Sequence, residues 1–170
     1  MSASSVSANL PPVITSRHHG TTFDRLPAPT EPACELDAAS NLDITTILLL
    51  DDDLELAETL KSLLQARNFL VTTVKNGVEG LREVMTMDFD VILCDMLMPT
   101  MPGDMFYLAV QKVKPHLCSR FLFITGNGGD HRTNDFLQKT DGLVVFKPVP
   151  NDELVQMISL VLKRNAQRRG

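Results

Sequence analysis

The sequence predicts an α/β fold in which a doubly wound, five-stranded parallel sheet carries five helices. From Ile44 onward, short apolar runs alternate with longer stretches whose apolar residues recur every three or four positions, as in successive strand and helix units. The short runs are nearly continuous, which is typical of strands buried on both faces of a parallel sheet. The chain has 170 residues, of which 44% are hydrophobic, enough for one such core.

Five apolar runs predict the strands, and the stretches between them predict the helices. Asn76 with Glu79 forms a capping-box pattern at the start of the second helix, and Asn151 followed by two acids starts the last helix. The fourth helix has the weakest pattern, with Phe136 and Leu137 as its clear apolar anchors. The predicted strands are 46–50, 69–74, 90–94, 120–124 and 143–146, and the predicted helices lie near 56–64, 78–85, 104–114 and 130–139, with the last beginning at 151.

The chain divides into three predicted parts. Residues 1–43 are rich in Ser, Ala, Thr and Pro and show no sustained period, which predicts a disordered N-terminal extension. The folded domain is predicted to span 44–165. Residues 166–170 form a basic C-terminal end, which the negative end of the last helix dipole would favour without any partner.

Composition excludes several classes of protein. A formal charge of −5 and a pI near 5.3 argue against a general affinity for nucleic acid or anionic membranes. No apolar run approaches the roughly 18 residues of a membrane span, and the N-terminus lacks a signal-peptide pattern. The three cysteines are widely separated, so neither a disulfide framework nor a zinc site is indicated. We therefore expect a cytoplasmic protein with no nucleic-acid or membrane partner.

Polar residues stand where four of the predicted strands end. Because the carboxyl ends of parallel strands meet at one edge of the sheet, near the point where strand order reverses, we expect these side chains to lie close together. Each of them alone could be structural, since acids often cap helices, but the four strand ends together favour a site. The residues are Asp51, Asp52 and Asp53 after the first strand, Asp95 after the third, Thr125 after the fourth and Lys147 after the fifth.

These residue types indicate phosphoryl chemistry. Crowded carboxylates repel one another, and a hard cation held by oxygens relieves the repulsion, with Mg²⁺ favoured where protein ligands are few and a phosphate lies nearby. A carboxylate beside the metal and Lys147 can attack phosphorus, because both positive charges neutralise the oxygens as they gather charge. Thr125 can hydrogen-bond one of those oxygens. We therefore predict that Asp95 takes the phosphoryl group.

At these residues the sequence resembles the receiver domains of two-component response regulators. The matching stretches are ILLLDDD (47–53), VILCDMLMPTMPG (91–103), FLFITG (121–126) and VVFKP (144–148), and they occur in the family's order. The resemblance covers about residues 44–164. It implies the flavodoxin-like receiver fold of a single-domain, chemotaxis-regulator-like protein. It also implies that Asp95 is the phosphoacceptor, which attacks a phosphohistidine and forms an acyl phosphate.

The resemblance further implies a ligand set for Mg²⁺. Asp52 and Asp95 would bind the metal directly, together with the backbone carbonyl of Leu97, while Asp51 would act largely through a metal-bound water. Asp53 is expected outside this set, with an N-cap or surface role.

The resemblance also implies how the phosphoryl group is held. Thr125 and the backbone amide of Gly126 would bind its oxygens, and Lys147 would bridge a phosphoryl oxygen and the carboxylate. Pro99 and Gly103 match the loop after the acceptor, where they would fix a tight turn close to the metal.

The chain departs from the family at two places. Receivers often carry an aromatic ring three residues before the lysine, but this position is Val144, so the usual aromatic switch is in doubt. Phe146 should point elsewhere and belong to the core. The glycine-rich run 126–129 predicts a flexible loop through which signalling could act instead.

Four methionines lie near the acceptor in the sequence, and two roles for them stay open: packing in the core, or forming an adaptable docking surface. They are Met96, Met98, Met101 and Met105.

The predicted function is a stand-alone receiver, not a turnover enzyme. Only 23 residues follow Lys147, so we expect output through contacts with an unknown protein target. The phosphodonor would be a sensor histidine kinase or a histidine phosphotransfer protein. Two alternatives stay open: a haloacid-dehalogenase-type phosphatase or phosphotransferase with Asp51 as nucleophile, and an interaction module that works without phosphorylation. Sustained turnover of a phosphate ester would favour the former.

Overall fold

The structure, a computed structural model, describes residues 44–126 and 131–169. The predicted N-terminal extension lies outside the described residues, as does most of the glycine-rich run. Within the described ranges, no helix is both long enough and apolar enough to cross a membrane.

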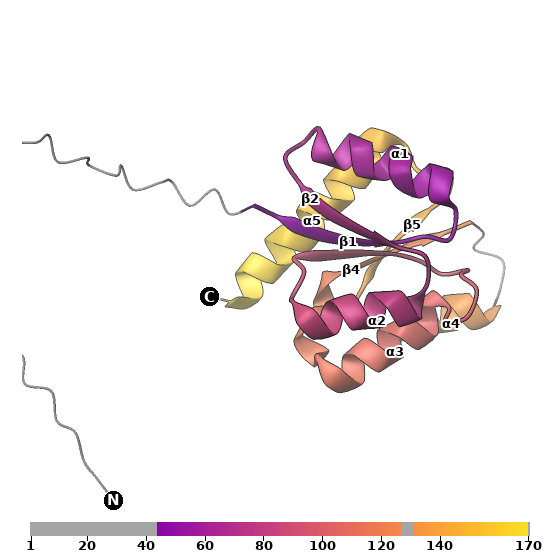
Figure 1. The fold of residues 1–170 in the computed structure, drawn as a ribbon. Coiled ribbons are helices and arrows are strands. Elements are labelled where there is room, and N and C mark those ends of the chain that lie inside the picture. The colour runs from indigo at the N-terminus through magenta and orange to yellow at the C-terminus, as the bar shows by residue number, and fades with distance from the viewer. Residues whose placement is uncertain (1–43, 127–130, 170) are drawn as a thin grey trace, which may run out of the picture. The chain divides into compact units, whose positions relative to one another are not determined.

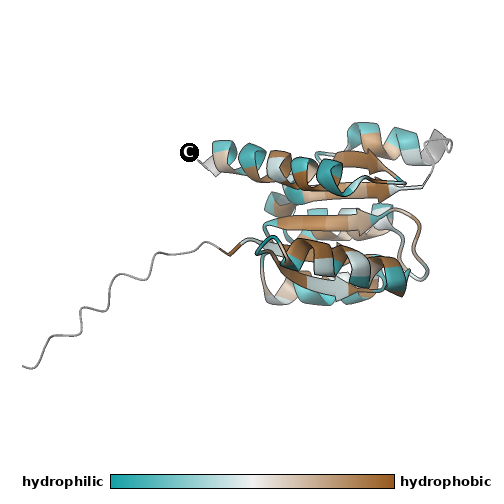
Figure 2. Ribbon diagram, turned by 90° about the horizontal axis from the view of Figure 1, so that it is seen from above, coloured by the Kyte–Doolittle hydropathy of each residue, from teal (hydrophilic) through white to brown (hydrophobic). Residues whose placement is uncertain are grey.

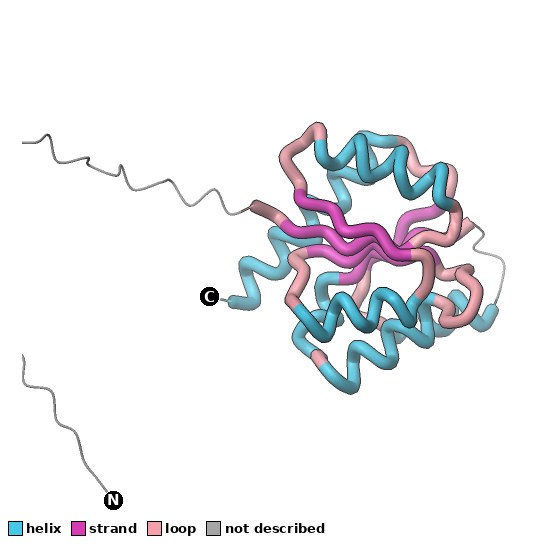
Figure 3. Tube along the Cα trace, viewed as in Figure 1, coloured by secondary structure: helices cyan, strands magenta, loops and turns pink. Residues whose placement is uncertain are grey.

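All five strands pair in parallel, in the order β2-β1-β3-β4-β5. The chain adds β2 on one side of β1 and then returns to add β3 on the other side, so the strand order reverses between β1 and β3. Figure 3 shows the strands as one magenta layer between cyan helices. The predicted fold class is confirmed, with every strand within one residue of its predicted bounds. The strands are β1 (Thr46–Leu50), β2 (Leu70–Val74), β3 (Val91–Asp95), β4 (Phe121–Thr125) and β5 (Leu143–Phe146).

Helices cover both faces of this sheet. Figure 1 shows α1 and α5 on one face and α2, α3 and α4 on the other. A short 3-10 helix, η1, precedes β4 and was not predicted. The helices are α1 (Leu54–Gln65), α2 (Gly77–Thr86), α3 (Gly103–Val113), η1 (Pro115–Arg120), α4 (His131–Lys139) and α5 (Asn151–Arg169).

The core follows from the strand sequences. Along β1, Leu48 and Leu50 pack into the cluster beneath α2 and α3, while Ile47 and Leu49 pack into the cluster beneath α1 and α5. Successive strand side chains alternate faces, so a fully apolar strand needs a helix layer on each side. Figure 2 shows this as apolar strands between helices that are apolar on one side and polar on the other.

Two predicted helix starts are confirmed. The carboxylate of Asp53 accepts hydrogen bonds at 3.1 Å from the backbone amides of Glu55 and Leu56, which caps α1. At α2, the Asn76 side chain accepts from two backbone amides, and Glu79 reaches back to the Lys75 amide at 3.1 Å. These caps fix where each helix leaves the sheet edge.

The prediction that Phe146 belongs to the core is wrong, because its side chain is 54% exposed. It is the last residue of β5, and β5 is an edge strand of the sheet. Phe146 shares a face with Val144, two residues earlier, whereas the buried Val145 points to the opposite face.

The last helix, α5, continues through Arg169, so residues 166–169 of the predicted basic end extend this helix.

Candidate functional site

Three carboxylates meet where the strand order reverses. Asp51 follows β1, and Asp95 is the last residue of the neighbouring strand β3. Together with Asp52, each offers a carboxylate oxygen, and these oxygens lie within 4.8 Å of one another. Asp51 and Asp95 are buried, while Asp52 is exposed at the mouth of the site.

The donor set fits a hard divalent cation. Backbone amides hold one oxygen of each buried acid, Asp53 N donating to Asp51 at 2.9 Å and Leu97 N donating to Asp95 at 3.1 Å. Such bonds orient the carboxylates without neutralising them. Three clustered carboxylates with one side open to solvent are suited to Mg²⁺, which keeps several waters and uses few protein ligands.

Lys147 crosses the site from the end of β5. Its ammonium group donates to Asp95 at 2.7 Å and to Asp51 at 3.1 Å. Burial alone would lower the pKa of Lys147, but Asp95 and then Asp51 outweigh it and raise the pKa above its ordinary value, so the side chain is a cation. For the acid Asp51, burial has the opposite effect and raises the pKa, although the hydrogen bond from the Asp53 amide and the contact with Lys147 oppose that shift.

Thr125, the predicted hydroxyl residue, ends β4, the strand next to Asp95. Thr125 is buried at the end of that strand, which pairs with β3 beside Asp95. Its backbone carbonyl accepts from the Lys147 amide at 2.7 Å, which joins β4 to β5 at the site. The next residue, Gly126, is exposed, and a Cβ built on it would meet nothing within 4 Å. The backbone there can therefore approach a ligand freely.

The loop after Asp95 turns back tightly against the site. A Cβ on Gly103 would lie 2.6 Å from the Asp95 carbonyl oxygen and 3.0 Å from the Met96 Cα. The Gly103 amide donates to the Met96 carbonyl at 3.2 Å, and Thr100 has a positive φ of 69°. Glycine at 103 is needed because backbone atoms occupy the place of a side chain.

The family model of the response regulator receiver domain matches residues 47–159. The chain belongs to this family. A curated relative from Haemophilus influenzae, "Transcriptional regulatory protein CpxR homolog", is 30% identical over 123 residues, which are 72% of this chain and 52% of the relative. "Transcriptional regulatory protein GlrR" of Escherichia coli is 30% identical over 71% of this chain and 27% of its own length. The receiver chain thus spans about half or less of these relatives.

Solved receiver structures share the fold. A response regulator receiver domain from Clostridium thermocellum is 25% identical with a TM-score of 0.66, and the match covers 73% of this chain and 98% of that one. A chemotaxis response regulator of Vibrio cholerae is 25% identical with a TM-score of 0.63, over 70% of this chain and 99% of that one. Both support the predicted flavodoxin-like receiver architecture.

The structure brings together four of the predicted site side chains, while the roles assigned to them stay predictions. Asp51, Asp52 and Asp95 cluster, and Lys147 contacts two of them. The amide of Leu97 contacts Asp95, while its own side chain is exposed. The roles of its carbonyl and of the Gly126 amide stay predictions.

The methionines divide between the two predicted roles. Met96 and Met98 are buried in the core, and Met101 packs against it partly buried. Met105 is 52% exposed on α3. Three of the four therefore serve packing, which leaves Met105 as the one that presents its side chain to solvent.

An aromatic cluster that the sequence did not predict packs beside Val144. Val144 is partly buried and pairs in register with Phe123 of β4. The rings of Phe123, Tyr107 and Phe136 lie mutually within 5.6–5.7 Å between centroids. Phe136 brings α4 into this cluster, and Phe136 and Val144 pack against the same part of the core. Only the joint placement of β4, α3 and α4 reveals it.

Proposed function

We propose that the protein accepts a phosphoryl group from a phosphohistidine onto Asp95 and signals through protein contacts. The observation that carries this proposal is the Lys147 ammonium, which bridges Asp95 and Asp51 beside a third carboxylate. This arrangement holds an anionic nucleophile next to a fixed positive charge, as phosphoryl transfer requires.

The transfer itself is a displacement at phosphorus. A carboxylate oxygen of Asp95 attacks, a P–O bond forms, and the P–N bond to the donor imidazole breaks. The imidazole leaves with the electron pair and takes up a proton from water. Lys147 faces the oxygens that gain charge, and the Thr125 hydroxyl and the Gly126 amide donate hydrogen bonds to them.

Asp52, Asp95 and the Leu97 carbonyl would hold Mg²⁺, with Asp51 acting through a water. When bound, the ion neutralises charge on the phosphoryl oxygens. Asp51 contributes in a second way: it accepts from Lys147 and from the Asp53 amide, and so keeps the ammonium centred over the acceptor.

A protein phosphodonor fits the surface next to the site. An apolar hollow of about 500 Å³ opens beside Lys147 and could take an apolar side chain from a histidine kinase or phosphotransfer protein. Its apolar lining includes Leu56 and Leu60 of α1 together with Pro148, Val149 and Leu154.

The chemical nature of the phosphorylated bond tests the proposal. After incubation with a phosphorylated histidine phosphotransfer protein and Mg²⁺, the chain should carry one phosphoryl group that hydroxylamine removes, as expected of an acyl phosphate. A hydroxylamine-resistant phosphate would point to a serine, threonine or tyrosine and would contradict the proposal. Sustained release of phosphate from a phosphate ester would instead favour the phosphatase alternative with Asp51 as nucleophile.

A further inference from the structure

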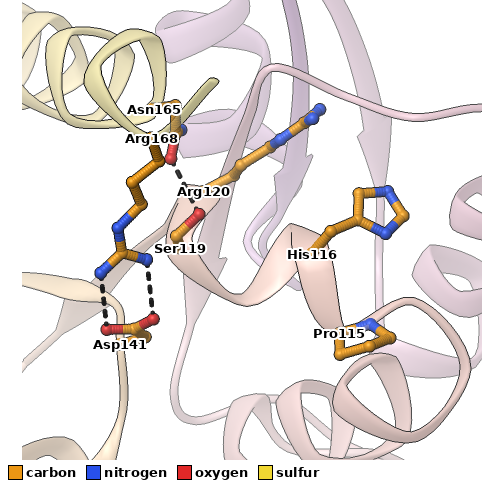
Figure 4. Close-up of a pocket in the computed structure, with 7 residues that line it drawn as sticks. All are labelled: Pro115, His116, Ser119, Arg120, Asp141, Asn165 and Arg168. Atoms are coloured by element: carbon orange, nitrogen blue, oxygen red, sulfur yellow. Dashed lines mark hydrogen bonds and ion pairs between the residues drawn. The ribbon is translucent and has the colours of Figure 1, made fainter. Parts of the chain in front are cut away.

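A polar pocket opens at the edge of the sheet opposite the acceptor site. It has a volume of about 380 Å³ and lies between η1, the start of β5 and the last turns of α5 (Figure 4). Ser119 and Arg120 stand just before β4, whereas Thr125 ends that strand, so the length of β4 separates the two sites. We refer to this feature as the β4-start pocket. Its volume lies within the range of about 300–1,000 Å³ usual for small-molecule sites.

Buried polar side chains gather at this pocket. In the part of the chain that the structure describes, six polar side chains are buried, and three of them, Asp51, Asp95 and Thr125, form the acceptor site. The other three all line the β4-start pocket: Ser119, Arg120 and Asn165. Burying polar groups is costly unless they are paired. Their concentration at one place therefore resembles a built site more than ordinary packing.

Two hydrogen-bond donors in this region have no partner. Among the described residues, the buried side-chain atoms without one are Arg164 Nε and Asn165 Nδ2, neighbours on α5. One other atom of each side chain is hydrogen-bonded: Ser119 Oγ donates to Asn165 Oδ1 at 2.8 Å, and Arg164 Nη2 donates to the Ser119 carbonyl. A buried donor left unsatisfied costs about 1–3 kcal/mol, so both call for an acceptor.

Arginine side chains are concentrated at the pocket. Arg120 lies within it, Arg164 adjoins it, and Arg168 forms a two-pronged pair with Asp141 at 2.9 and 3.3 Å. Burial and the charge of Arg168 both lower the pKa of Arg164, as expected where cations crowd together. Among the described residues that line or adjoin the pocket, three are arginines and one is an aspartate, on a chain whose net charge is −5.

We propose that the β4-start pocket binds an oxyanion, a carboxylate or phosphate group whose oxygens accept from Asn165 Nδ2 and Arg164 Nε. Both nitrogens are shielded from solvent, so the ligand reaches them after a lining side chain moves. Arg168 is the group that moves, because its side chain is 51% exposed and its anchor, Asp141, is also half-exposed at the rim. The site is independent of phosphoryl transfer to Asp95.

NMR titration of the full chain tests this proposal. Inorganic phosphate and, separately, acetate are added without Mg²⁺ at constant ionic strength, with chloride as the balancing anion. Saturable shifts are expected at the backbone amides of 119, 120 and 165 and at the Asn165 side-chain amide, with a midpoint in the millimolar range or below. The tighter of the two ions identifies the class of oxyanion.

Variants connect the shifts to the proposed donors. Asn165→Asp removes a donor and adds a negative charge, so affinity should fall about tenfold or more. Asp141→Asn frees Arg168 and removes an acid from the rim, so affinity should rise several-fold, and this variant keeps the test decisive if Asn165→Asp does not fold. Asp95→Ala should leave the titration unchanged. The proposal is overturned if no saturable shift appears at tens of millimolar, or if Asp141→Asn leaves affinity the same.

Discussion

Lys147 and Asp95 lie 2.7 Å apart, amine to carboxylate, although 52 residues separate them in the sequence. The contact joins the edge strand β5 to the central strand β3 across β4. It places a positive charge at the proposed nucleophile before any phosphoryl group arrives. A preorganised charge of this kind costs little reorganisation during transfer.

The two glycines of the site should respond oppositely to substitution. Gly103→Ala forces a Cβ against the Asp95 carbonyl at 2.6 Å, and we expect about 1–3 kcal/mol of destabilisation with slower phosphorylation. Gly126→Ala meets open space and keeps the backbone amide, so stability should stay within about 0.5 kcal/mol and phosphorylation should persist. Urea unfolding and intact-mass measurements check both. Loss of phosphorylation in folded Gly126→Ala would argue against the proposed use of its amide.

The apolar hollow should matter for protein donors alone. Leu56→Glu places a charge in its wall, and transfer from a phosphohistidine protein should slow about tenfold or more, as for an interface hot spot. Transfer from a small phosphodonor should change little, because Leu56 is not among the residues proposed to bind the metal or the phosphoryl group. Leu108→Glu on α3 is the matched control, since Leu108 is also partly exposed but lies on the opposite face of the sheet. Equal slowing with both donors would contradict a docking role.

The aromatic cluster offers an internal reporter of activation. Tyr107 is the single tyrosine of the chain, which has no tryptophan. The ring of Tyr107 packs on that of Phe136, with 5.6 Å between the ring centroids. If α4 shifts on phosphorylation, Tyr107 fluorescence should change when Mg²⁺ and a small phosphodonor are added. Phe136→Leu removes ring contacts worth about 0.5–1.5 kcal/mol each and should reduce that change while phosphoryl uptake continues. An unaltered fluorescence change in this variant would exclude Phe136 as the coupling ring.

Acid should weaken the contact between the loop after α2 and the segment at the start of η1. Lys114 and then His116, both at 2.7 Å, hold the pKa of Asp88 below its ordinary value. Because folding lowers this pKa, the ionised carboxylate stabilises the fold at pH values above its unfolded-state pKa. This contribution to stability is lost as the pH falls through the folded-state pKa. Asp88→Asn should therefore lower the free energy of unfolding at pH 7 by about 0.2–1 kcal/mol, because the pair is partly exposed.

The pH dependence of this Asp88 effect distinguishes it from a change in packing. The difference between Asp88→Asn and wild type should shrink as the solution becomes more acidic than about pH 4, where the unfolded carboxyl protonates. Asp152→Asn, at a carboxylate that is 92% exposed and 3.8 Å from Arg67, should show little difference at any pH. Urea unfolding at several pH values measures both. A constant deficit in Asp88→Asn would refute the electrostatic origin.

Local signals predicted most of the fold. The continuous apolar runs and the caps at Asp53 and Asn76 are properties of neighbouring residues, and they located the strands and helix starts closely. The convergence of Asp51, Asp95 and Lys147 was predictable as well, because strand direction alone brings strand ends to one edge.

Features that depend on long-range placement were missed. Phe146 is exposed because β5 lies at the edge of the sheet. The residues of β5 alone do not indicate whether the strand is central or at the edge. The β4-start pocket needs Ser119 and Asn165, 46 residues apart, to meet across η1 and α5. The ring of Phe136 could be recognised as a helix anchor, but its partners on α3 and β4 could not.

Mapping the phosphoryl group by mass spectrometry tests the central claim most directly. The intact chain is incubated with Mg²⁺ and a small phosphodonor, and wild type, Asp95→Asn, Asp51→Asn and Asp53→Asn are compared. The account predicts one phosphoryl group at Asp95 in wild type, none in Asp95→Asn, reduced uptake in Asp51→Asn and near-normal uptake in Asp53→Asn, whose side chain caps α1. Undiminished uptake in folded Asp95→Asn, or a phosphoryl group mapped to Asp51, would contradict it.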